Sequence, residues 1–361
     1  MPPWDIVSAP ITYKVSFLVQ PVPILLNVLG LIGEVEQLSG LPEWVIRTAQ
    51  ALTPEQRHEA RLCDHLLPTR IIFNSTHQQS FSSFINALEE SDAQFLRDEA
   101  LSWLEDAPNY PGLATLLAQP NSFVSYMQEF MSDKGIDVEE KFWLDVYYYL
   151  THPKESQALM VRVLRFMWDK FMRTEWGRVE KTLTEVVKAH SQIHYDGGNW
   201  GDIIEAVTGR DMRQHEKLTE YATQISEIVF IPTPFLGPYL SIYRRPDQQD
   251  LVIFFGARLP RGAKLKSDEL DRADLLVRLN ALADETRLRV LELLTEQDEI
   301  CAQDFMTLLD LSQSSASRHL RQLTASGYVT ERRRDVAKCY ALNRERIQET
   351  IQALSKFLDK K

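Results

Sequence analysis

The segment from Leu311 to Gly327 constrains the fold of this chain more than any other. It contains an N-cap residue, a stripe of apolar residues and a terminating glycine, which together specify one short amphipathic helix. Ser312 is a natural N-cap, since its hydroxyl can accept a hydrogen bond from an amide of the first turn. Gly327 can end the helix in the left-handed conformation. Apolar residues recur at i, i+4 and i+7 on one face, namely Ala316, Leu320 and Leu323. The opposite face carries Ser314, Arg318, Arg321 and Ala325.

A helix with an apolar back and an outer face of serine and arginine has the shape and the donors to enter the major groove of DNA. The same pattern also suits an ordinary solvated amphipathic helix. Segment 311–327 alone therefore leaves both interpretations open, and its surroundings have to decide between them.

The charge distribution favours an anionic partner for this part of the chain. The formal net charge of the 361 residues is −11, which argues against a protein that coats nucleic acid or anionic membrane with its whole surface. Residues 261–361 nevertheless hold 18 basic and 17 acidic side chains, and residues 313–346 hold 8 basic and 3 acidic ones. A basic window on an acidic chain indicates a localised anion-binding face.

Cysteine use and the N-terminus point to the cytoplasm. Cys63, Cys301 and Cys339 are far apart in the sequence, so we expect no disulfide framework. The N-terminus has no basic segment followed by an apolar core. The longest apolar run, PVPILLNVLGLIG, is interrupted by proline and glycine and is too short to span a bilayer. We therefore expect a cytoplasmic protein without a membrane segment.

The first 266 residues predict a mostly helical α+β domain. Residues 11–19 suit a strand, and residues 22–104 carry helical patterns broken at Pro42, Pro54 and Pro68. Residues 106–122 look like a connection with one short helical piece.

Residues 137–191 are also predicted to be helical, with Thr151 and Pro153 as the cap and first-turn proline of one helix. That helix carries an apolar stripe, which is more often part of a core than the wall of a ligand pocket. The stripe consists of Val161, Leu164, Trp168, Phe171, Met172 and Trp176. Three β-rich runs within residues 226–257 then predict a small antiparallel sheet. The polar segment 258–267 predicts a hinge, which places the boundary between an N-terminal domain, 1–266, and a C-terminal domain, 267–361.

Two clusters in the N-terminal domain resemble metal sites, and both are better explained without a metal. Residues 63–65, Cys-Asp-His, are adjacent, so a helix cannot direct all three at one ion. His190 and His194 are four residues apart, with Asp196 as a third donor, but position 191 is serine where a zinc protease needs glutamate. We expect no metal and no cofactor.

The last hundred residues follow the order of a winged helix-turn-helix. Helical patterns cover residues 268–283, 285–297, 302–310, 313–325 and a final stretch from about 344. Before the final helix, the runs YVTERRR and KCYAL predict two short strands that form a basic ribbon. In such a domain the second helix of the pair enters the major groove and the first braces it against the backbone.

The ribbon and the last helix suggest two further surfaces. Basic side chains of the ribbon can reach phosphates or the minor groove, namely Arg332, Arg333, Arg334 and Lys338. The final helix has an apolar face that needs a partner, formed by Ile347, Ile351, Leu354, Phe357 and Leu358. Dimerisation through that face suits a protein that binds paired half-sites on double-stranded DNA.

The motifs ALADETRLRVLELL, LSQSSASRHLRQLTASGYV and KCYAL closely resemble the ArsR-type (arsenic-repressor-like) winged-helix transcription regulators over about residues 270–358. The resemblance implies a homodimeric repressor with residues 313–325 as its recognition helix. By position it makes Gln313, Ser314, Ser315, Ser317 and Arg318 candidates for contacts with base edges or phosphates, and Arg321 shares their outer face. His319 borders the apolar stripe, so we favour a packing or phosphate role for it over base reading.

The chain departs from the metal-sensing members of that family. Those members carry a Cys-x-Cys pair, where this sequence reads Cys301-Ala302-Gln303 and so lacks one thiolate donor. The last helix also lacks the His and acidic ligands of zinc-sensing relatives. We therefore expect no metal sensing and interpret Cys301 as a small buried hydrophobe, while a redox role of Cys301 or Cys339 stays open. The ribbon tip at Asp335 also lacks the glycine usual in the family.

The preferred function is a DNA-binding transcriptional regulator whose N-terminal domain senses an unidentified small molecule or assembles the dimer. The N-terminal segments EIVFIPTPFLGPYLSIY and LVIFFGARLP are similar to the extensions of uncharacterised ArsR-like regulators, which names no ligand. One alternative is an enzyme within residues 1–260, although the sequence has no Walker loop, G-x-S-x-G or H-E-x-x-H motif. A second alternative is a winged helix that binds protein instead of DNA.

Overall fold

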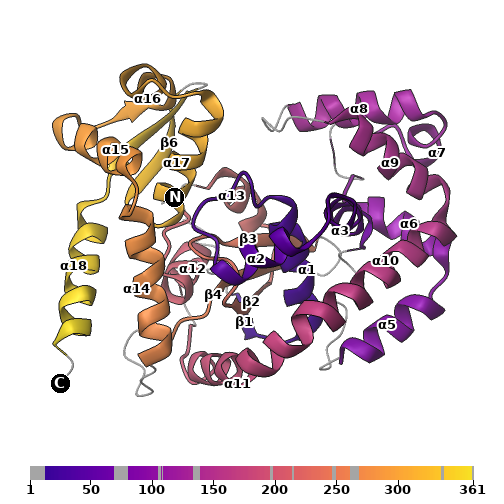
Figure 1. Cartoon of the computed structure of the whole chain (residues 1–361), viewed down its shortest axis with the longest axis horizontal. Helices are drawn as coiled ribbons and strands as arrows, with labels where there is room; N and C mark the ends of the chain where they lie inside the picture. The colour runs from indigo at the N-terminus through magenta and orange to yellow at the C-terminus, as the bar shows by residue number, and fades with distance from the viewer. Residues whose placement is uncertain are drawn as a thin grey trace, which may run out of the picture. The chain divides into compact units, whose positions relative to one another are not determined.

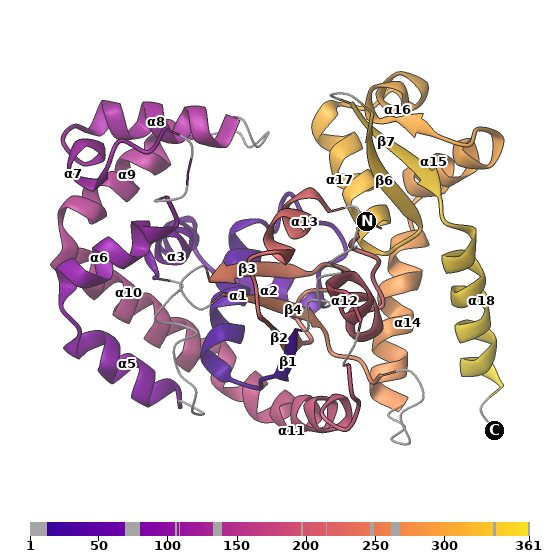
Figure 2. The ribbon, with the colours of Figure 1, turned by 180° about the vertical axis from the view of Figure 1, so that it is seen from behind.

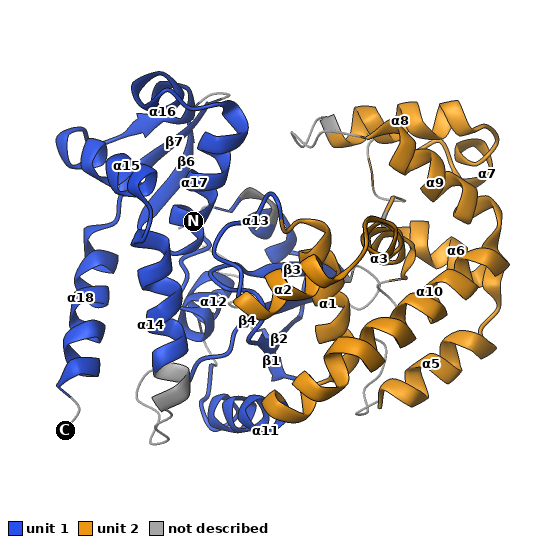
Figure 3. Ribbon diagram, in the orientation of Figure 1, with its two compact units in different colours: residues 1–19, 36–42, 180–361 blue, residues 20–35, 43–179 orange. Residues whose placement is uncertain are grey.

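The structure, a computed structural model, describes residues 13–68, 80–104, 107, 109–132, 139–195, 198–213, 215–245, 249–260, 268–334 and 337–359 (Figure 1). The chain forms two compact units, unit 1 with residues 1–19, 36–42 and 180–361, and unit 2 with residues 20–35 and 43–179 (Figure 3). The expected boundary between residues 266 and 267 lies inside unit 1 and stays a prediction.

Unit 2 is built from helices throughout its described residues. They are α1 (Pro21–Gly33), α2 (Glu43–Ala51), α3 (Pro54–Leu66), α5 (Phe81–Glu90), α6 (Ala93–Leu101), η1 (Ser102–Leu104), α7 (Leu113–Leu116), α8 (Pro120–Ser132), α9 (Glu140–Thr151), α10 (Pro153–Met167), η2 (Trp168–Met172) and the start of α11 (Arg173–His190). The break expected at Pro54 coincides with the start of a helix: Pro54 is the first residue of α3, whose N-cap Thr53 forms a capping box with Gln56. Within residues 106–122, α7 is the short helix expected there, but α8 already begins at Pro120.

The helix predicted to start at Thr151 begins one residue later than expected. Thr151 ends α9, and its hydroxyl donates to the carbonyl oxygen of Tyr147 (3.0 Å), while His152 precedes α10. The predicted stripe is mainly core, since Val161, Leu164, Met172 and Trp176 are buried and Trp168 and Phe171 are half-buried. The π-helical turn η2 interrupts the α-helical phase of the stripe at Trp168.

The first sheet of unit 1 differs from the predicted antiparallel meander. Its strands are β1 (Lys14–Phe17), β2 (Glu227–Thr233), β3 (Ser241–Arg245) and β4 (Asp250–Gly256), in the order β1-β2-β4-β3 (Figure 2). β1 pairs parallel with β2, β2 pairs parallel with β4, and only β3 is antiparallel to its neighbour. The antiparallel sheet was therefore wrong, although the predicted strands are present.

Burial explains the parallel pairing. Six consecutive residues of β2 and six of β4 are buried, the uninterrupted apolar pattern of strands covered on both faces. The loop from Pro234 to Leu240 lets β3 pair at the outer edge of β4, so β2 and β4 become parallel neighbours. Helix α11, with α12 (Trp200–Thr208) and α13 (Glu216–Ala222), contributes to the core against these strands, as Val186, Ile204 and Leu218 do with Phe230 and Ile253.

The last part of unit 1 has the predicted winged helix-turn-helix order, and the α+β fold class is confirmed. Its elements are α14 (Asp268–Leu282), α15 (Glu285–Glu296), β5 (Ile300–Cys301), α16 (Ala302–Leu309), α17 (Gln313–Ala325), β6 (Val329–Arg334), β7 (Ala337–Leu342) and α18 (Arg344–Leu358). The short strand β5, which was not predicted, pairs antiparallel with β7 and gives a sheet of order β5-β7-β6.

Tyr328 joins the helices around this winged helix. Its ring is fully buried, and its hydroxyl lies 3.2 Å from the carbonyl oxygen of Arg278 in α14 and 3.0 Å from the hydroxyl of Thr350 in α18. Helices α14 and α18 accordingly run side by side in both views (Figures 1 and 2). Among the described residues, no helix has the length and apolar character needed to cross a membrane.

Candidate nucleic-acid interface

Helix α17 forms as its sequence predicts. The hydroxyl of Ser312 accepts a hydrogen bond from the amide of Ser315 (3.2 Å), and Gly327 follows the helix with a φ of 80°. The apolar stripe of Ala316, Leu320 and Leu323 is buried in the core that also holds Phe305 of α16. Asp310 ends α16 in the left-handed conformation, which gives the tight turn between the two helices.

The polar face of α17 is exposed over its first two and a half turns. Exposed side chains on it are Gln313, Ser314, Ser317, Arg318 and Arg321, while Ser315 is half-buried. The last turn differs, because Gln322, Ala325 and Ser326 are buried. Ala325 was therefore misplaced on the outer face. The exposed polar face of this helix therefore runs from its N-terminus to Arg321.

His319 is buried, with 7% of its surface exposed, and this places it in the packing of the helix. Its Nδ1 lies 3.5 Å from a carboxylate oxygen of Asp284, which is the N-cap of α15. Burial lowers the pKa of His319, while the carboxylate of Asp284 acts in the opposite direction. The sequence favoured a packing or phosphate role for His319 over base reading, and its burial supports packing.

Arg287 is a structural residue that the sequence reasoning did not single out. Its guanidinium is buried and donates from Nε to the carbonyl oxygen of Ala281 (2.6 Å) and from Nη2 to that of Asn280 (2.9 Å). These carbonyls belong to the last turn of α14, so Arg287 caps that helix from the next one. The spacing Asp-x-x-Arg after an apolar helix is the sequence pattern that could have identified it.

The cations of the ribbon are exposed, and Arg332 and Lys338 form ion pairs. Arg332 donates from Nε to Glu299 (2.6 Å) and lowers the pKa of that carboxyl, and Lys338 lies 2.9 Å from Glu331. Arg333 lies opposite Lys338 in the β6–β7 ladder, and Arg334 is the last described residue before the tip. Exposed ion pairs contribute little stability, so these cations can exchange a carboxylate for a phosphate. The predicted tip at Asp335 lies outside the described residues.

The expectation of three unlinked cysteines is wrong. Cys301 and Cys339 are joined by a disulfide, with Cα atoms 3.8 Å apart, and they stand directly opposite each other in the β5–β7 pair. Cys339 is buried but Cys301 is half-exposed at the N-cap of α16, so Cys301 is not a buried hydrophobe. The two cysteines are 38 residues apart in the sequence, and they come together only because β5, which was not predicted, pairs with β7.

The two candidate metal clusters contain side chains that are already engaged. Nε2 of His190 lies 3.0 Å from the carbonyl oxygen of Arg258, and Nδ1 lies 2.7 Å from the hydroxyl of Tyr195. A carbonyl only accepts, so Nε2 donates and Nδ1 accepts. In the first cluster Cys63 is buried. Asp196 lies outside the described residues, and in the part of the chain that is described no three His, Cys, Asp or Glu side chains come together as metal ligands would.

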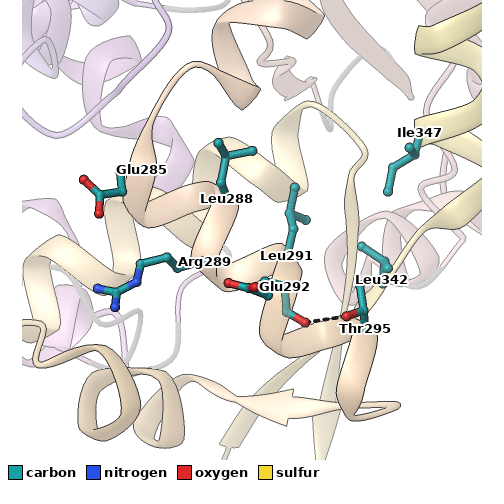
Figure 4. A pocket seen from close by; sticks show the side chains of 8 residues that line it. All are labelled: Glu285, Leu288, Arg289, Leu291, Glu292, Thr295, Leu342 and Ile347. Atoms are coloured by element: carbon teal, nitrogen blue, oxygen red, sulfur yellow. Dashed lines mark hydrogen bonds between the residues drawn. The ribbon is translucent and has the colours of Figure 1, made fainter.

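The apolar face of α18 is only partly covered. Ile351, Phe357 and Leu358 are 53%, 41% and 70% exposed, and Ile347 and Leu354 are half-buried. Figure 4 shows the adjoining hollow, where Leu288 and Leu291 of α15 line the same space as Leu342 and Ile347. Leu276 of α14 is also 60% exposed. The apolar residues of α18 and of the hollow thus form an apolar surface beside the helix-turn-helix.

A loop from the N-terminal part of unit 1 contacts the last turn of α17. Gly40 has a φ of 80°, and a Cβ atom there would lie 2.5 Å from Nε2 of Gln322. The backbone of the loop is fixed by Tyr239, whose hydroxyl donates to the carbonyl oxygen of Ser39 (2.7 Å). Neither amide atom of Gln322 has a hydrogen-bond partner within the described residues. A segment outside the winged helix therefore lies close against the last turn of α17.

We expect His319 to make the winged helix less stable in mild acid. The folded state keeps the imidazole neutral because its pKa is lowered, whereas the unfolded state takes up a proton below about pH 6.5. The free energy of unfolding should therefore fall as the pH drops below that value and level off below the folded pKa. His319→Gln should remove this contribution, at most about 1.4 kcal/mol per pH unit, from urea unfolding curves. The exposed His194→Gln is the control, and an unchanged pH slope in His319→Gln would contradict the assignment.

Gly40→Ala should destabilise unit 1 by about 1–3 kcal/mol, because it adds backbone strain and a clash with Gln322. In a Gln322→Ala background the clash is absent, so the same substitution should cost less by about 0.5 kcal/mol or more. Urea unfolding of the four proteins of this cycle measures the coupling. Additive effects would mean that the contact does not form in solution.

Comparison with known proteins places this region in a family. Residues 284–331 match the family described as "Bacterial regulatory protein, arsR family". The arsenic resistance transcriptional regulator ArsR2 of Pseudomonas putida is 38% identical over 85 residues, which cover 22% of this chain and 74% of that protein. The arsenical resistance operon repressor of Escherichia coli is 50% identical over 52 residues, 14% of this chain and 44% of the repressor. The transcriptional activator HlyU of Vibrio cholerae is 31% identical over 96 residues, 26% of this chain and 88% of HlyU. The exposed recognition helix, the basic ribbon and these similarities lead to one conclusion: the chain belongs to the arsR family of bacterial regulatory proteins.

Proposed function

We propose that this chain is a cytoplasmic, homodimeric repressor that binds a specific DNA operator through α17 and the β6–β7 ribbon. The observation that carries the proposal is the exposed face of α17, where serine, glutamine and arginine side chains are presented on a helix fixed from behind by its apolar stripe. The base-contact candidates are Gln313, Ser314, Ser315, Ser317, Arg318 and Arg321. Arg332, Arg333, Arg334 and Lys338 would bind phosphates beside them.

The experiment that tests this function is a titration of the purified chain with DNA from upstream of its own gene. Two salt concentrations and a scrambled competitor separate specific from non-specific binding. Tight binding that survives the competitor and weakens with salt would support the proposal. Binding that is equally weak for every fragment, or absent, would contradict a specific operator at that site and move the search to other DNA.

The surface around α18 supports a homodimer. Ile347, Ile351, Leu354, Phe357 and Leu358 would form its centre. The adjoining hollow beside Leu288 and Ile347 would be filled by the second copy, since an apolar surface of this extent is usually covered by a partner. A twofold axis would present two copies of α17 to two half-sites.

The rest of the N-terminal domain would sense a small molecule or assemble the dimer. The contact of Gly40 with Gln322 supports this role, because any rearrangement that moves the loop also acts on the recognition helix. A ligand would shift DNA affinity only by the difference of its affinities for the two arrangements. A metal sensor of the two-cysteine type is not proposed, since Cys301 has no Cys-x-Cys partner and its sulfur is bonded to Cys339.

Arg318→Ala should weaken binding to the specific operator by about 1–3 kcal/mol, because a bidentate contact with a base edge would be lost. Arg333→Ala should weaken binding to all DNA alike and reduce the slope of log affinity against log salt by about one unit, because one phosphate contact would be lost. The control is Arg47→Ala, which removes an arginine from unit 2 whose side chain is 73% exposed. If Arg318→Ala and Arg333→Ala both bound DNA with wild-type affinity, the proposed DNA-binding surface of α17 and the ribbon would be wrong.

Ile351→Lys should convert the dimer into a monomer, because it buries a charge at the centre of the proposed interface. Sedimentation velocity measures the change, and binding to paired half-sites should weaken with it. Leu308→Lys on α16 is the matched control. Leu308 is also exposed (52%), but α16 packs mainly against α15, α17, β5 and β7 and not against α18. A stable Ile351→Lys dimer would place the interface elsewhere.

A further inference from the structure

The disulfide between Cys301 and Cys339 links the two parts of the winged helix that would touch DNA. Cys301 lies in β5 and is also the N-cap of α16, the first helix of the helix-turn-helix. Cys339 lies in β7, whose other neighbour is the arginine-bearing strand β6, with Arg332 directly opposite Cys339. The bond therefore fixes the ribbon relative to the helix pair.

The two cysteines differ in exposure. Cys339 is fully buried, whereas Cys301 is half-buried, so Cys301 is the one of the two that a small reagent can approach. The N-terminus of a helix also favours a negatively charged sulfur, which is the nucleophilic form of cysteine. Cys339 lies directly across the strand pair, with its Cα atom 3.8 Å from that of Cys301, and is in place to attack any adduct formed there.

Reduction must change the local packing. Two thiols that are not bonded have to stand further apart than two bonded sulfurs, because only bonded atoms approach within van der Waals contact. Cys339 is packed in the interior, so the added space comes from a turn of the Cys301 side chain or from separation of β7 and β5. The strand pair is only two residues long on the β5 side, so it has few other hydrogen bonds to hold it.

We propose that Cys301 and Cys339 are a reversible thiol–disulfide site that reacts with low-molecular-weight disulfides and thiols and adjusts the affinity for DNA. The DNA part of this proposal rests on the proposed function. The bridged form holds the ribbon and α16 in register and loses less conformational freedom on binding, so it binds DNA more tightly. Disulfides rarely persist in a reducing compartment, so in the cytoplasm proposed for this chain the bond would form and break with the thiol pool.

The reaction is an exchange in two steps. The thiolate of Cys301 attacks one sulfur of a small disulfide such as glutathione disulfide, which forms a mixed disulfide and releases one glutathione thiolate. The thiolate of Cys339 then attacks the sulfur of Cys301 and releases the second glutathione. The two protons of the protein thiols end on two glutathione thiols, and two electrons pass from the protein to the small disulfide. Two molecules of glutathione reverse the exchange.

The experiment compares the full chain after equilibration with reduced glutathione and with glutathione disulfide. Alkylation of the denatured protein and mass analysis should find three modified cysteines in the reduced sample and only Cys63 in the oxidised one. The oxidised sample should bind the DNA fragment from upstream of the gene about fivefold more tightly or better. Where the chain binds that fragment specifically, equal affinities or tighter binding by the reduced form would overturn the proposal, and failure of the bridge to form would overturn it in every case.

Three variants separate this site from a general effect of oxidation. Cys301→Ser and Cys339→Ser should each bind DNA with one affinity in both buffers, close to that of the reduced wild type. Cys63→Ala, which removes the buried cysteine of unit 2, should keep the full response. A response that survives in Cys301→Ser would overturn the proposal.

Hydrogen exchange, measured without DNA, tests the cysteine site independently of the proposed function. Hydrogen exchange of β5, β7 and the first turn of α16 should be faster in the reduced wild type than in the oxidised one. If neither form binds specific DNA, the proposed function fails, and this comparison decides the inference alone: faster exchange supports the site, and identical exchange overturns it.

Discussion

The buried guanidinium of Arg287 fixes the corner on which the winged helix depends. It binds the last carbonyl oxygens of α14 from within α15, while the neighbouring Asp284 caps the start of α15 and lies beside His319 of α17. Arg287 and Asp284 thus cap the end of α14 and the start of α15, and Asp284 also lies next to α17. A buried charge is stable only with such partners, and removing one of them leaves the other unpaired.

The two faces of α17 have different roles: one packs in the protein and the other is exposed. Buried residues of α17 face Arg287 and the apolar core, and its exposed serines and arginines face away. Tyr328 connects α14 to α18 by hydrogen bonds to both, so the proposed dimer helix is attached to the same support as the recognition helix. Arg346 of α18 also donates from Nε to the carbonyl oxygen of Ser326 at the end of α17 (3.0 Å), and this link would help to set the spacing between two half-sites.

Local sequence patterns were sufficient to predict individual helices and strands. They did not predict contacts between segments that are far apart in the sequence. Ser312, the stripe from Ala316 to Leu323 and Gly327 specify α17 within 16 residues, so caps and periodicity were sufficient. The apolar runs of β2 and β4 indicate strands that are covered on both faces, but which strand lies beside which depends on where β3 pairs. The bond from Cys301 to Cys339 and the contact of Gly40 with Gln322 also join segments far apart in sequence. Exposure of Arg318 followed from periodicity, whereas burial of Ala325 did not.

The two contacts that escaped prediction act on different parts of the DNA-binding surface. The cysteine pair ties the ribbon to the start of α16, whereas Gly40 meets α17 in its last turn. A change at the cysteines would act on the ribbon whose arginines are proposed to bind phosphates, and a change at Gly40 would act on the helix that is proposed to contact bases. Free-energy effects at separate sites without shared partners add approximately. The same winged helix could therefore combine a chemical input through its ribbon with a ligand input through its recognition helix, because the two inputs do not compete for the same residues.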